Sequence, residues 1–460
     1  MFDKILIANR GEIAVRVIRA CHELGVRTVV AYSEADRDSL AVRLADEAVC
    51  VGPPAAAKSY LNIPNIVSAA LVTGCDAIHP GYGFLSENAY FAEICEKCSL
   101  VFIGPPPGVM EEMGDKAAAR KAMRRAGLPL VPGTETSLKS VGEAREAAEL
   151  IGYPVVLKAT MGGGGRGMRV AQGDAELARF YPIARAEAEG AFGSGELYLE
   201  KYMVEPRHIE FQFLADQYGK TVHFGERDCS LQRHHQKVLE ESPSVVLSPE
   251  MRASMGEMVV KAMRSIGYVG AGTVELLLDR NKHFYFIETN ARIQVEHPVT
   301  EMVTGVDLVK WQIRIAAGEH LTLDQEGIII RGHAIECRIN AEDHERAFRP
   351  DSGRIESYLP PGGPGVRVDS HLFGGCFVPP YYDSLLAKLI VWGQDRDDAI
   401  RRMDRALSEF VIEGVKTTIP LQRQLVNHPS FRKGDFHTRF IERHVVPSDN
   451  VAVPEVEIAR

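Results

Sequence analysis

The sequence contains no long apolar run. No stretch approaches the roughly 20 consecutive apolar residues that a helix needs to cross a bilayer, so a membrane-embedded protein is not indicated. Residues 1–10 place charged residues on both sides of a short apolar run, without the apolar core and cleavage signal of a secretory leader. We therefore expect a protein of the cytoplasm that has no membrane partner.

Paired cysteines are scarce. Of the eight cysteines only Cys95 and Cys98 have the spacing of a metal or redox motif, and no second pair lies near them. Their segment has the pattern of an amphipathic helix. We therefore expect ordinary thiols in a reducing compartment rather than a zinc or redox site.

Positive charge is in deficit. The chain has 53 Lys and Arg residues against 62 Asp and Glu residues, a formal net charge of -9. Because binding to nucleic acid by counterion release needs the opposite balance, no nucleic-acid partner is expected. The length of 460 residues exceeds what one ordinary hydrophobic core organises, so two to four domains are expected.

Two common phosphate-binding signatures are missing. The turn at residues 9–12 lacks the complete glycine fingerprint of a dinucleotide-binding fold, and the glycine run at residues 162–167 has no following Gly-Lys-Ser/Thr. NAD binding and a P-loop NTPase are therefore disfavoured. The turn at residues 9–12 is then a substrate-facing or a purely structural turn.

The first third of the chain alternates apolar strand patterns with helical ones. Strands are expected at residues 4–8, 27–32, 48–51 and 76–79, with a helix from Gly11 to Gly25 after the first. This order predicts a doubly wound parallel sheet. Ligands of such sheets lie at the carboxyl ends of the strands, where residues 9–12 and 79–83 fall.

A proline-rich stretch at residues 104–108 precedes a helix that runs to Ala126, which predicts a domain boundary near residue 114. Beyond it, a strand at residues 154–158 leads into the glycine run, and residues 168–171 form a return strand, so the glycines join a hairpin. Such a loop can lay its backbone N–H groups against phosphates, although glycines also occur in flexible surface hairpins.

Polar residues in the same region could supply the cations and hydrogen bonds that a triphosphate and a ribose require. Each of them taken alone is equally compatible with an ordinary polar surface position. They are Lys116, Lys158, Glu200, Lys201, His208, Gln232, His235 and Lys237.

The segment at residues 284–298 runs from a buried strand into a dense polar stretch. In extended geometry side chains repeat every two residues, so one face would carry Glu288, Asn290, Arg292, Gln294 and Glu296. Glu275 of the preceding strand would lie opposite Glu288, and with Asn290 would offer oxygen ligands to Mg²⁺. Arg292 near Glu296 suggests an anion held beside a base. The competing interpretation is an exposed strand face with alternating charges.

A third region begins near Arg331. Strands are expected at residues 332–338, 354–358 and 365–369, followed by a helix at residues 396–410. The tail after Val446 has no clear pattern.

Several long motifs in this order resemble biotin carboxylase, the ATP-grasp component of biotin-dependent carboxylases, over residues 1 to about 445. The matching stretches are residues 7–14, 79–88 (HPGYGFLSEN), 162–170 (GGGGRGMRV), 226–237, 292–301 (RIQVEHPVTE) and 332–343. The resemblance implies an α/β chain with an N-terminal doubly wound parallel-sheet domain, an ATP-grasp domain and a C-terminal mixed α+β domain. The implied boundaries are 1–114, 115–330 with a glycine-rich lid at about 131–203, 331–446, and a tail at 447–460.

The resemblance also implies a set of residues that bind ATP. These are Lys116, Lys158, Gly164, Gly165, Glu200, Lys201, Met203, His208, Gln232, His235, Glu275 and Glu288. The metal ligands would be Glu275, Glu288 and Asn290, for Mg²⁺ or alternatively Mn²⁺.

The family's catalytic residues are likewise present. The resemblance assigns Lys237, Arg292, Gln294 and Val295 to bicarbonate, Glu296 to its deprotonation, Arg338 to the biotin enolate, and Tyr82 to biotin binding. This sequence departs from the family pattern in three places near the site, which are Thr289, Ala291 and His234.

The implied reaction uses ATP and bicarbonate to form carboxyphosphate and then carboxylates biotin. Because no Ala-Met-Lys-Met-like attachment sequence occurs, the biotin is expected on a separate carrier protein, with a carboxyltransferase as the next partner. A homodimer is a family expectation. Acetyl-CoA is the favoured final acceptor, with propionyl-CoA, pyruvate and 2-oxoglutarate as alternatives.

Two other functions stay open from the residues alone. One is a different ATP-grasp ligase that forms an acylphosphate, and the other is a nucleotide-binding regulatory protein with a degenerate site.

Overall fold

The structure is a computed structural model that describes residues 1–160 and 168–445. Gly164, Gly165 and the expected tail at 447–460 lie outside these residues. No helix in the described ranges is long and apolar enough to cross a membrane.

The N-terminal region is a parallel sheet, as the sequence predicted, with the strand order β3-β2-β1-β4-β5; the edge strand β5 was not predicted. Ile5, Leu6 and Ile7 of β1 are wholly buried, because helices cover both faces of a parallel sheet. The strands are β1 (Lys4–Ile7), β2 (Arg27–Ser33), β3 (Glu47–Gly52), β4 (Ala77–His79) and β5 (Val101–Phe102). The helices are α1 (Gly11–Glu23), α2 (Leu40–Leu44), α3 (Ile63–Val72), α4 (Ala89–Lys97) and α5 (Pro107–Gly114), with short 3₁₀ turns at Glu34–Asp36 and Ala56–Lys58.

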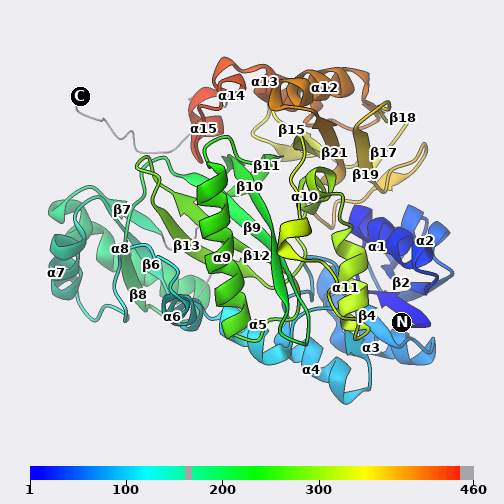
Figure 1. The fold of residues 1–460 in the computed structure, drawn as a ribbon, viewed down its shortest axis with the longest axis horizontal. Helices are drawn as coiled ribbons and strands as arrows, with labels where there is room; N and C mark the ends of the chain where they lie inside the picture. Colours follow the sequence, from blue (N-terminus) through cyan, green and yellow to red (C-terminus); the bar gives the residue numbers. More distant parts are fainter. Residues whose placement is uncertain (161–167, 446–460) are drawn as a thin grey trace.

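The largest sheet has eight strands in the order β13-β12-β9-β10-β11-β14-β21-β19 (Figure 1). It crosses the boundary expected near residue 330, because β11 pairs antiparallel with β14. Its strands are β9 (Arg207–Ala215), β10 (Thr221–Arg233), β11 (Gln236–Ser242), β12 (Gly270–Leu278), β13 (Phe284–Asn290), β14 (His333–Asn340), β19 (Val366–Ser370) and β21 (Leu385–Gly393). The helices in this part of the chain are α9 (Pro249–Ser265), α10 (His297–Thr304) and α11 (Leu308–Ala316), followed by a 3₁₀ turn at Gln325–Gly327.

The N-terminal region and the eight-stranded sheet share their apolar cores. Ile13 and Val17 of α1 belong to one buried cluster with Leu214 of β9, Ala271 of β12 and Ile313 of α11. Burial of a common apolar surface holds the two sheets together. The turns that follow β1 and β4 lie beside the large sheet, because residues 9–13 and 82–84 line a common cavity with residues of that sheet.

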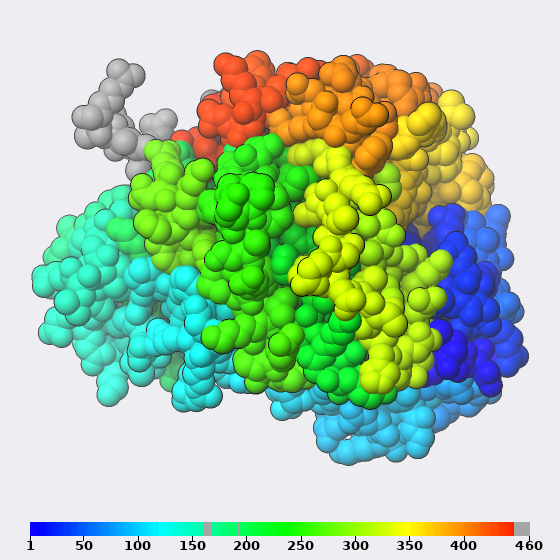
Figure 2. All heavy atoms as spheres, in the orientation of Figure 1, coloured from blue at the N-terminus to red at the C-terminus, as the bar shows by residue number. Residues whose placement is uncertain are grey.

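Residues from about 131 to 203 form a smaller lobe with its own apolar core (Figures 1 and 2). It follows α6 (Lys116–Ala126) and contains β6 (Val155–Ala159), β7 (Arg169–Ala171), β8 (Leu197–Lys201), α7 (Val141–Ile151) and α8 (Asp174–Phe192). β6 and β7 pair antiparallel, so the predicted hairpin is confirmed, although the joining glycines lie outside the described residues. In Figure 2 this lobe lies at the opposite end of the molecule from the N-terminal residues.

The C-terminal region covers the far end of the large sheet with helices. They are α12 (Arg396–Glu409), α13 (Ile419–Asn427), α14 (Pro429–Arg432) and α15 (Phe440–His444). The remaining strands are β15 (Glu342–Asp343), β16 (Arg349–Pro350), β17 (Gly353–Arg354), β18 (Ser357–Leu359), β20 (Phe377–Val378) and β22 (Val411–Glu413).

The prediction of a single strand at residues 354–358 is wrong. β17 pairs with β20, whereas β18 pairs with β22, so the chain changes partner between them. Ile355, which is wholly buried, lies at this change, and its backbone N–H donates to Cys376 O. An alternating pattern cannot distinguish one strand from two short ones with different neighbours.

One buried carboxylate joins the large sheet to the C-terminal helices. Glu241 of β11 contacts the His333 ring of β14 at 2.8 Å and accepts from Arg396 Nε of α12 at 2.7 Å. Burial by itself would raise the pKa of Glu241, but the His333 hydrogen bond and the Arg396 charge lower that pKa to about 2.

We predict that Glu241→Gln lowers the stability of the protein at neutral pH. A carboxylate whose pKa falls from 4.5 to about 2 on folding contributes about 3 kcal/mol above pH 4.5, and loses it as the pH falls from 4.5 to 2. Urea unfolding across this range should show a flatter pH dependence for the variant than for the unchanged protein. Parallel stability curves for the two proteins would contradict the assignment.

Candidate active site

A cavity of about 780 Å³ lies where the N-terminal turns, the large sheet and the C-terminal region meet. Its walls combine cations, carboxylates and aromatic rings. The first turns contribute residues 9–13 and 82–84, the large sheet contributes Lys237, Glu275, Glu288, Asn290 and Arg338, and residues 381–383 complete the wall.

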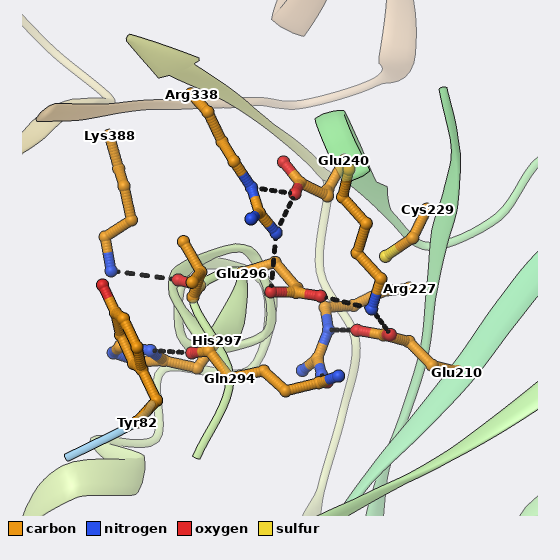
Figure 3. Close-up of polar contacts among 12 residues, drawn as sticks. Tyr82, Glu210, Arg227, Cys229, Glu240, Gln294, Glu296, His297, Arg338 and Lys388 are labelled. Carbon is orange, nitrogen blue, oxygen red and sulfur yellow. Dashed lines mark hydrogen bonds and ion pairs between the residues drawn. The ribbon is translucent and has the colours of Figure 1, made fainter. Parts of the chain in front are cut away.

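Glu296 lies at the centre of the charged wall (Figure 3). Its side chain is 2% exposed, and its two oxygens accept from Lys237 Nζ at 2.6 Å and Arg338 Nη2 at 3.0 Å. Burial opposes ionisation, but Lys237 and Arg338 outweigh it and hold the pKa of Glu296 well below its ordinary value. The site therefore contains an ionised carboxylate between two cations.

The prediction that the chain stays extended from Glu288 to Glu296 is wrong. β13 ends at Asn290, the chain then turns, and Glu296 is the N-cap residue of α10. Pro298 stands in the first turn of this helix, a position that proline favours, and it was the available sequence signal for a helix start. The side chains nevertheless meet, since Arg292, Gln294 and Glu296 all line the cavity.

The interpretation of this segment as an exposed charged face holds for Glu288, which is exposed, but is wrong for Asn290, Gln294 and Glu296, which are buried. Asn290, Gln294 and Glu296 are 6%, 3% and 2% exposed. Arg292 is held by Glu87 Oε2 at 3.0 Å and donates to Asn290 Oδ1 at 2.8 Å. Each of these polar groups therefore has a partner inside the wall.

The predicted pairing of two carboxylates across a hairpin is confirmed. Glu275 of β12 and Glu288 of β13 are opposite in register, and Asn290 Nδ2 donates to Glu275 Oε1 at 3.0 Å. Glu288 is exposed to the cavity, but the surrounding wall removes part of its solvation and so raises its pKa; the neighbouring Glu275 charge raises this pKa further, while Lys116 opposes the rise. Two carboxylates and an amide suit a hard divalent cation, which would relieve this repulsion.

Sequence reasoning missed Glu210 and Arg227. Glu210 of β9 binds Lys237 and accepts from Arg227 Nε at 2.5 Å, and both Glu210 and Arg227 are wholly buried. Arg227 also donates to Gln294 Oε1 at 2.6 Å and Gln212 Oε1 at 2.8 Å. The signal in the sequence was the two-residue spacing of His208, Glu210 and Gln212, which places three polar groups on one face of a buried strand.

The predicted ATP-binding residues fall into two groups. His208, His235, Glu275 and Glu288 line the cavity with Lys237. Gln232 Nε2 lies 2.8 Å from His208 Nδ1, and His208 Nε2 lies 3.0 Å from Glu275 Oε2, so this first group is linked by side-chain contacts.

The second group belongs to the smaller lobe and its connections. Lys158 Nζ donates to Glu200 Oε2 at 2.5 Å, while Lys201 Nζ donates to the carbonyls of Gly152 and Tyr153 at 2.9 and 2.8 Å. Met203 lies two residues after the end of β8. None of these four residues lines the cavity as described, so the structure does not bring them to the Glu296 wall.

The two residues predicted to face biotin come from different parts of the chain, the turn after β4 and strand β14. Arg338 Nε donates to Glu240 Oε1 at 2.6 Å in addition to its contact with Glu296. The Tyr82 hydroxyl donates to Glu12 Oε1. Both side chains line the cavity, together with Val295 and Gln294.

Three family models match the chain. The biotin carboxylase N-terminal domain matches residues 1–110, the ATP-binding domain of the carbamoyl-phosphate synthase L chain matches residues 115–324, and the biotin carboxylase C-terminal domain matches residues 336–443.

Characterised relatives match over nearly their whole length. Biotin carboxylase of Nostoc sp. is 58% identical, covering 96% of this chain and 99% of the relative. Biotin carboxylase 1 of Bacillus subtilis is 57% identical, covering 97% and 99%. The 2-oxoglutarate carboxylase small subunit of Hydrogenobacter thermophilus is 54% identical, covering 96% and 94%.

Solved structures agree with this relationship. The biotin carboxylase domain dimer of Hydrogenobacter thermophilus 2-oxoglutarate carboxylase, in complex with MgADP, ADP and bicarbonate, superposes with a TM-score of 0.91 at 54% identity, covering 96% of this chain and 98% of that one. Matched along its length in sequence and in fold, the chain belongs to the biotin carboxylase family.

Proposed function

We propose that the chain carboxylates biotin on a separate carrier protein, using ATP and bicarbonate and releasing ADP. The observation that supports this most directly is Glu296, an ionised carboxylate enclosed between Lys237 and Arg338. A base and two cations in one cavity suit an anionic substrate that must lose a proton.

Bicarbonate is a poor electrophile, so it must first be activated. Lys237 and Arg292 would hold the bicarbonate anion while Glu296 removes its proton. The bicarbonate oxygen then attacks the γ-phosphorus of ATP. ADP leaves and carboxyphosphate forms. Glu210 and Arg227 keep Lys237 and Gln294 in place for this step.

The second half of the reaction transfers the carboxyl group. Carboxyphosphate breaks down to CO₂ and phosphate, the phosphate removes the N1 proton of biotin, and the resulting enolate attacks CO₂. Arg338 would stabilise the enolate oxygen, and Tyr82 forms part of the biotin-facing wall. Glu275, Glu288 and Asn290 would hold Mg²⁺, or Mn²⁺, which offsets phosphate charge when bound.

The ATP-binding assignments are part of the proposal. His208, Gln232 and His235 lie on the cavity side, whereas Lys116, Lys158, Glu200, Lys201 and Met203 belong to the smaller lobe and its connections. Closure of that lobe over the nucleotide would exclude water from carboxyphosphate, which otherwise hydrolyses. We propose that residues 114 and 330 separate parts of the chain with different functions, although the large sheet crosses the second boundary.

We predict that ADP release from Mg²⁺-ATP requires bicarbonate and biotin together for full turnover and yields acid-labile carboxybiotin. Arg338→Ala should lower the biotin-dependent rate about a hundredfold or more, because a positioned donor to a developing oxyanion is lost. Arg346→Ala removes a surface guanidinium of the same region, with 77% side-chain exposure, and should leave the rate unchanged.

Other results of this assay would favour other functions. Acceleration of ADP release by a different amine or carboxylate, with no effect of biotin, would identify a different ATP-grasp ligase. ATP binding without turnover would favour a regulatory nucleotide-binding protein.

We also predict that Glu296→Gln lowers bicarbonate-dependent turnover about 10²- to 10⁴-fold, the range expected when a general base is removed. The affinity for ATP, measured by calorimetry, should change little, because Glu296 contacts the cations of the bicarbonate wall. Glu345→Gln, an exposed position, serves as the matched control. A Glu296 variant with normal turnover would rule out this residue as the base.

We propose acetyl-CoA as the final acceptor. The biotin carboxylases of Nostoc sp. and Bacillus subtilis are 58% and 57% identical, whereas that of Haemophilus influenzae is 54% identical, as is the 2-oxoglutarate carboxylase small subunit. We further propose a cytoplasmic homodimer that works with a biotin carboxyl carrier protein and a separate carboxyltransferase. The dimer named for the Hydrogenobacter structure supports the assembly.

The acceptor proposal predicts that labelled bicarbonate passes into malonyl-CoA when the chain is combined with the carrier and carboxyltransferase of its own organism. Acetyl-CoA, propionyl-CoA, pyruvate and 2-oxoglutarate should be supplied in parallel. Faster labelling of any product other than malonyl-CoA would replace acetyl-CoA by that acceptor. Light scattering of the purified chain would report its oligomeric state.

A further inference from the structure

Lys388 is a wholly buried lysine that none of the functional assignments above uses. It lies on β21, directly opposite Arg338 of β14 on one side and Asp369 of β19 on the other. A row of charged side chains therefore crosses three neighbouring strands beneath the Glu296 wall. An enclosed ammonium must find partners for its three N–H groups, because an unpaired buried charge is strongly unfavourable.

The partners of Lys388 come from three distant parts of the chain. Its Nζ donates to the backbone carbonyl of Val295 at 3.0 Å, lies 3.1 Å from Glu12 Oε1, and lies 3.9 Å from Asp369 Oδ2. The shortest of these contacts is therefore with the main chain of the residue that precedes Glu296. Figure 3 shows Lys388 approaching this segment from the same side as Arg338.

The other side of the segment is already held. The His297 ring nitrogen Nδ1 lies 2.7 Å from Gln294 O, and the Gln294 side chain bridges Arg227 and Glu275 at 2.6 and 2.7 Å. Val295 lies between Gln294, which these contacts hold in place, and Glu296. Without Lys388 its carbonyl would lose the charged donor that now fixes its direction.

The same ammonium also reaches the wall that carries Tyr82. Glu12 Oε1, which pairs with Lys388, accepts the Tyr82 hydroxyl as well. Lys388 thus connects the segment of Glu296 to the N-terminal residues that hold Tyr82.

We propose that Lys388 is a positioning residue, which holds the Val295 carbonyl so that the Glu296 carboxylate stays aligned with Lys237 and Arg338. The consequence for turnover rests on the proposed function, whereas the positioning itself does not. Misplacement of a reacting group by about 1 Å can cost about a hundredfold in rate.

The test compares Lys388→Met with Lys388→Gln. The two replacement side chains are equal to each other in length, are one atom shorter than lysine and lack its charge, but only glutamine carries N–H groups for the Val295 carbonyl. For Lys388→Met, kcat/KM for bicarbonate should fall about tenfold to a hundredfold, with the KM for ATP within about twofold of the unchanged protein. Lys388→Gln should recover a substantial part of this loss.

Asp369→Asn is the matched control. It removes a buried charge beside Lys388 without touching Val295, so it should lower the melting temperature while leaving kcat/KM for bicarbonate unchanged. If Lys388→Met fails to fold, the double variant Glu12→Gln/Lys388→Met is used in its place. It removes both charges of the buried pair and leaves neither of the two without its partner.

Hydrogen exchange measured by mass spectrometry gives a readout that is independent of activity. Peptides covering residues 291–299 should exchange faster in Lys388→Met, and at the normal rate in Lys388→Gln and Asp369→Asn. Unchanged exchange in Lys388→Met, or activity losses that follow the melting temperature equally in all variants, would overturn the proposal. Absence of bicarbonate- and biotin-dependent turnover in the unchanged protein would instead overturn the proposed function, and hydrogen exchange would still decide the positioning.

Discussion

The enclosure of ionised side chains on one face of the eight-stranded sheet is the constraint on which the site depends. Charge is costly to bury unless it is paired, and here the partners of each charge come from different strands. Lys237 meets Glu210, Glu275 and Glu296, and Arg338 meets Glu240 and Glu296. The sheet therefore has to bring β9, β11, β12 and β14 together before these side chains can meet their partners.

Arg227 illustrates why such a network is rigid. Its guanidinium is wholly buried and donates through Nε and both terminal nitrogens, to Glu210, Gln212, Thr273, Gln294 and Thr300. Because the N–H groups of a guanidinium point in fixed directions within one plane, the partners of Arg227 are held in one arrangement. The position of Gln294 is thereby tied to that of Glu210, and through Glu210 to Lys237.

The smaller lobe is built on a different principle. Its apolar core is separate from those of the two sheets, and Glu200 pairs with Lys158 inside the lobe and with Arg120 of the preceding helix α6. A unit with its own core can move as a body relative to the rest of the molecule. The division between a fixed charged wall and a separate lobe matches a reaction that needs a rigid base and a cover over its nucleotide.

The sequence by itself determined the features that depend on neighbours along the chain. Apolar runs broken by turns predicted the parallel sheet, and the spacing of two strands predicted that Glu275 and Glu288 face each other. The tertiary structure alone decided the turn after Asn290, the change of partner at Ile355, and the contacts of Glu210, Arg227 and Lys388. The physical reason is that side-chain period and turn chemistry are local properties, whereas the neighbour of a buried charge is set by which strands pair. Lys388 contacts Val295 across 93 residues of chain, and no local pattern records such a contact.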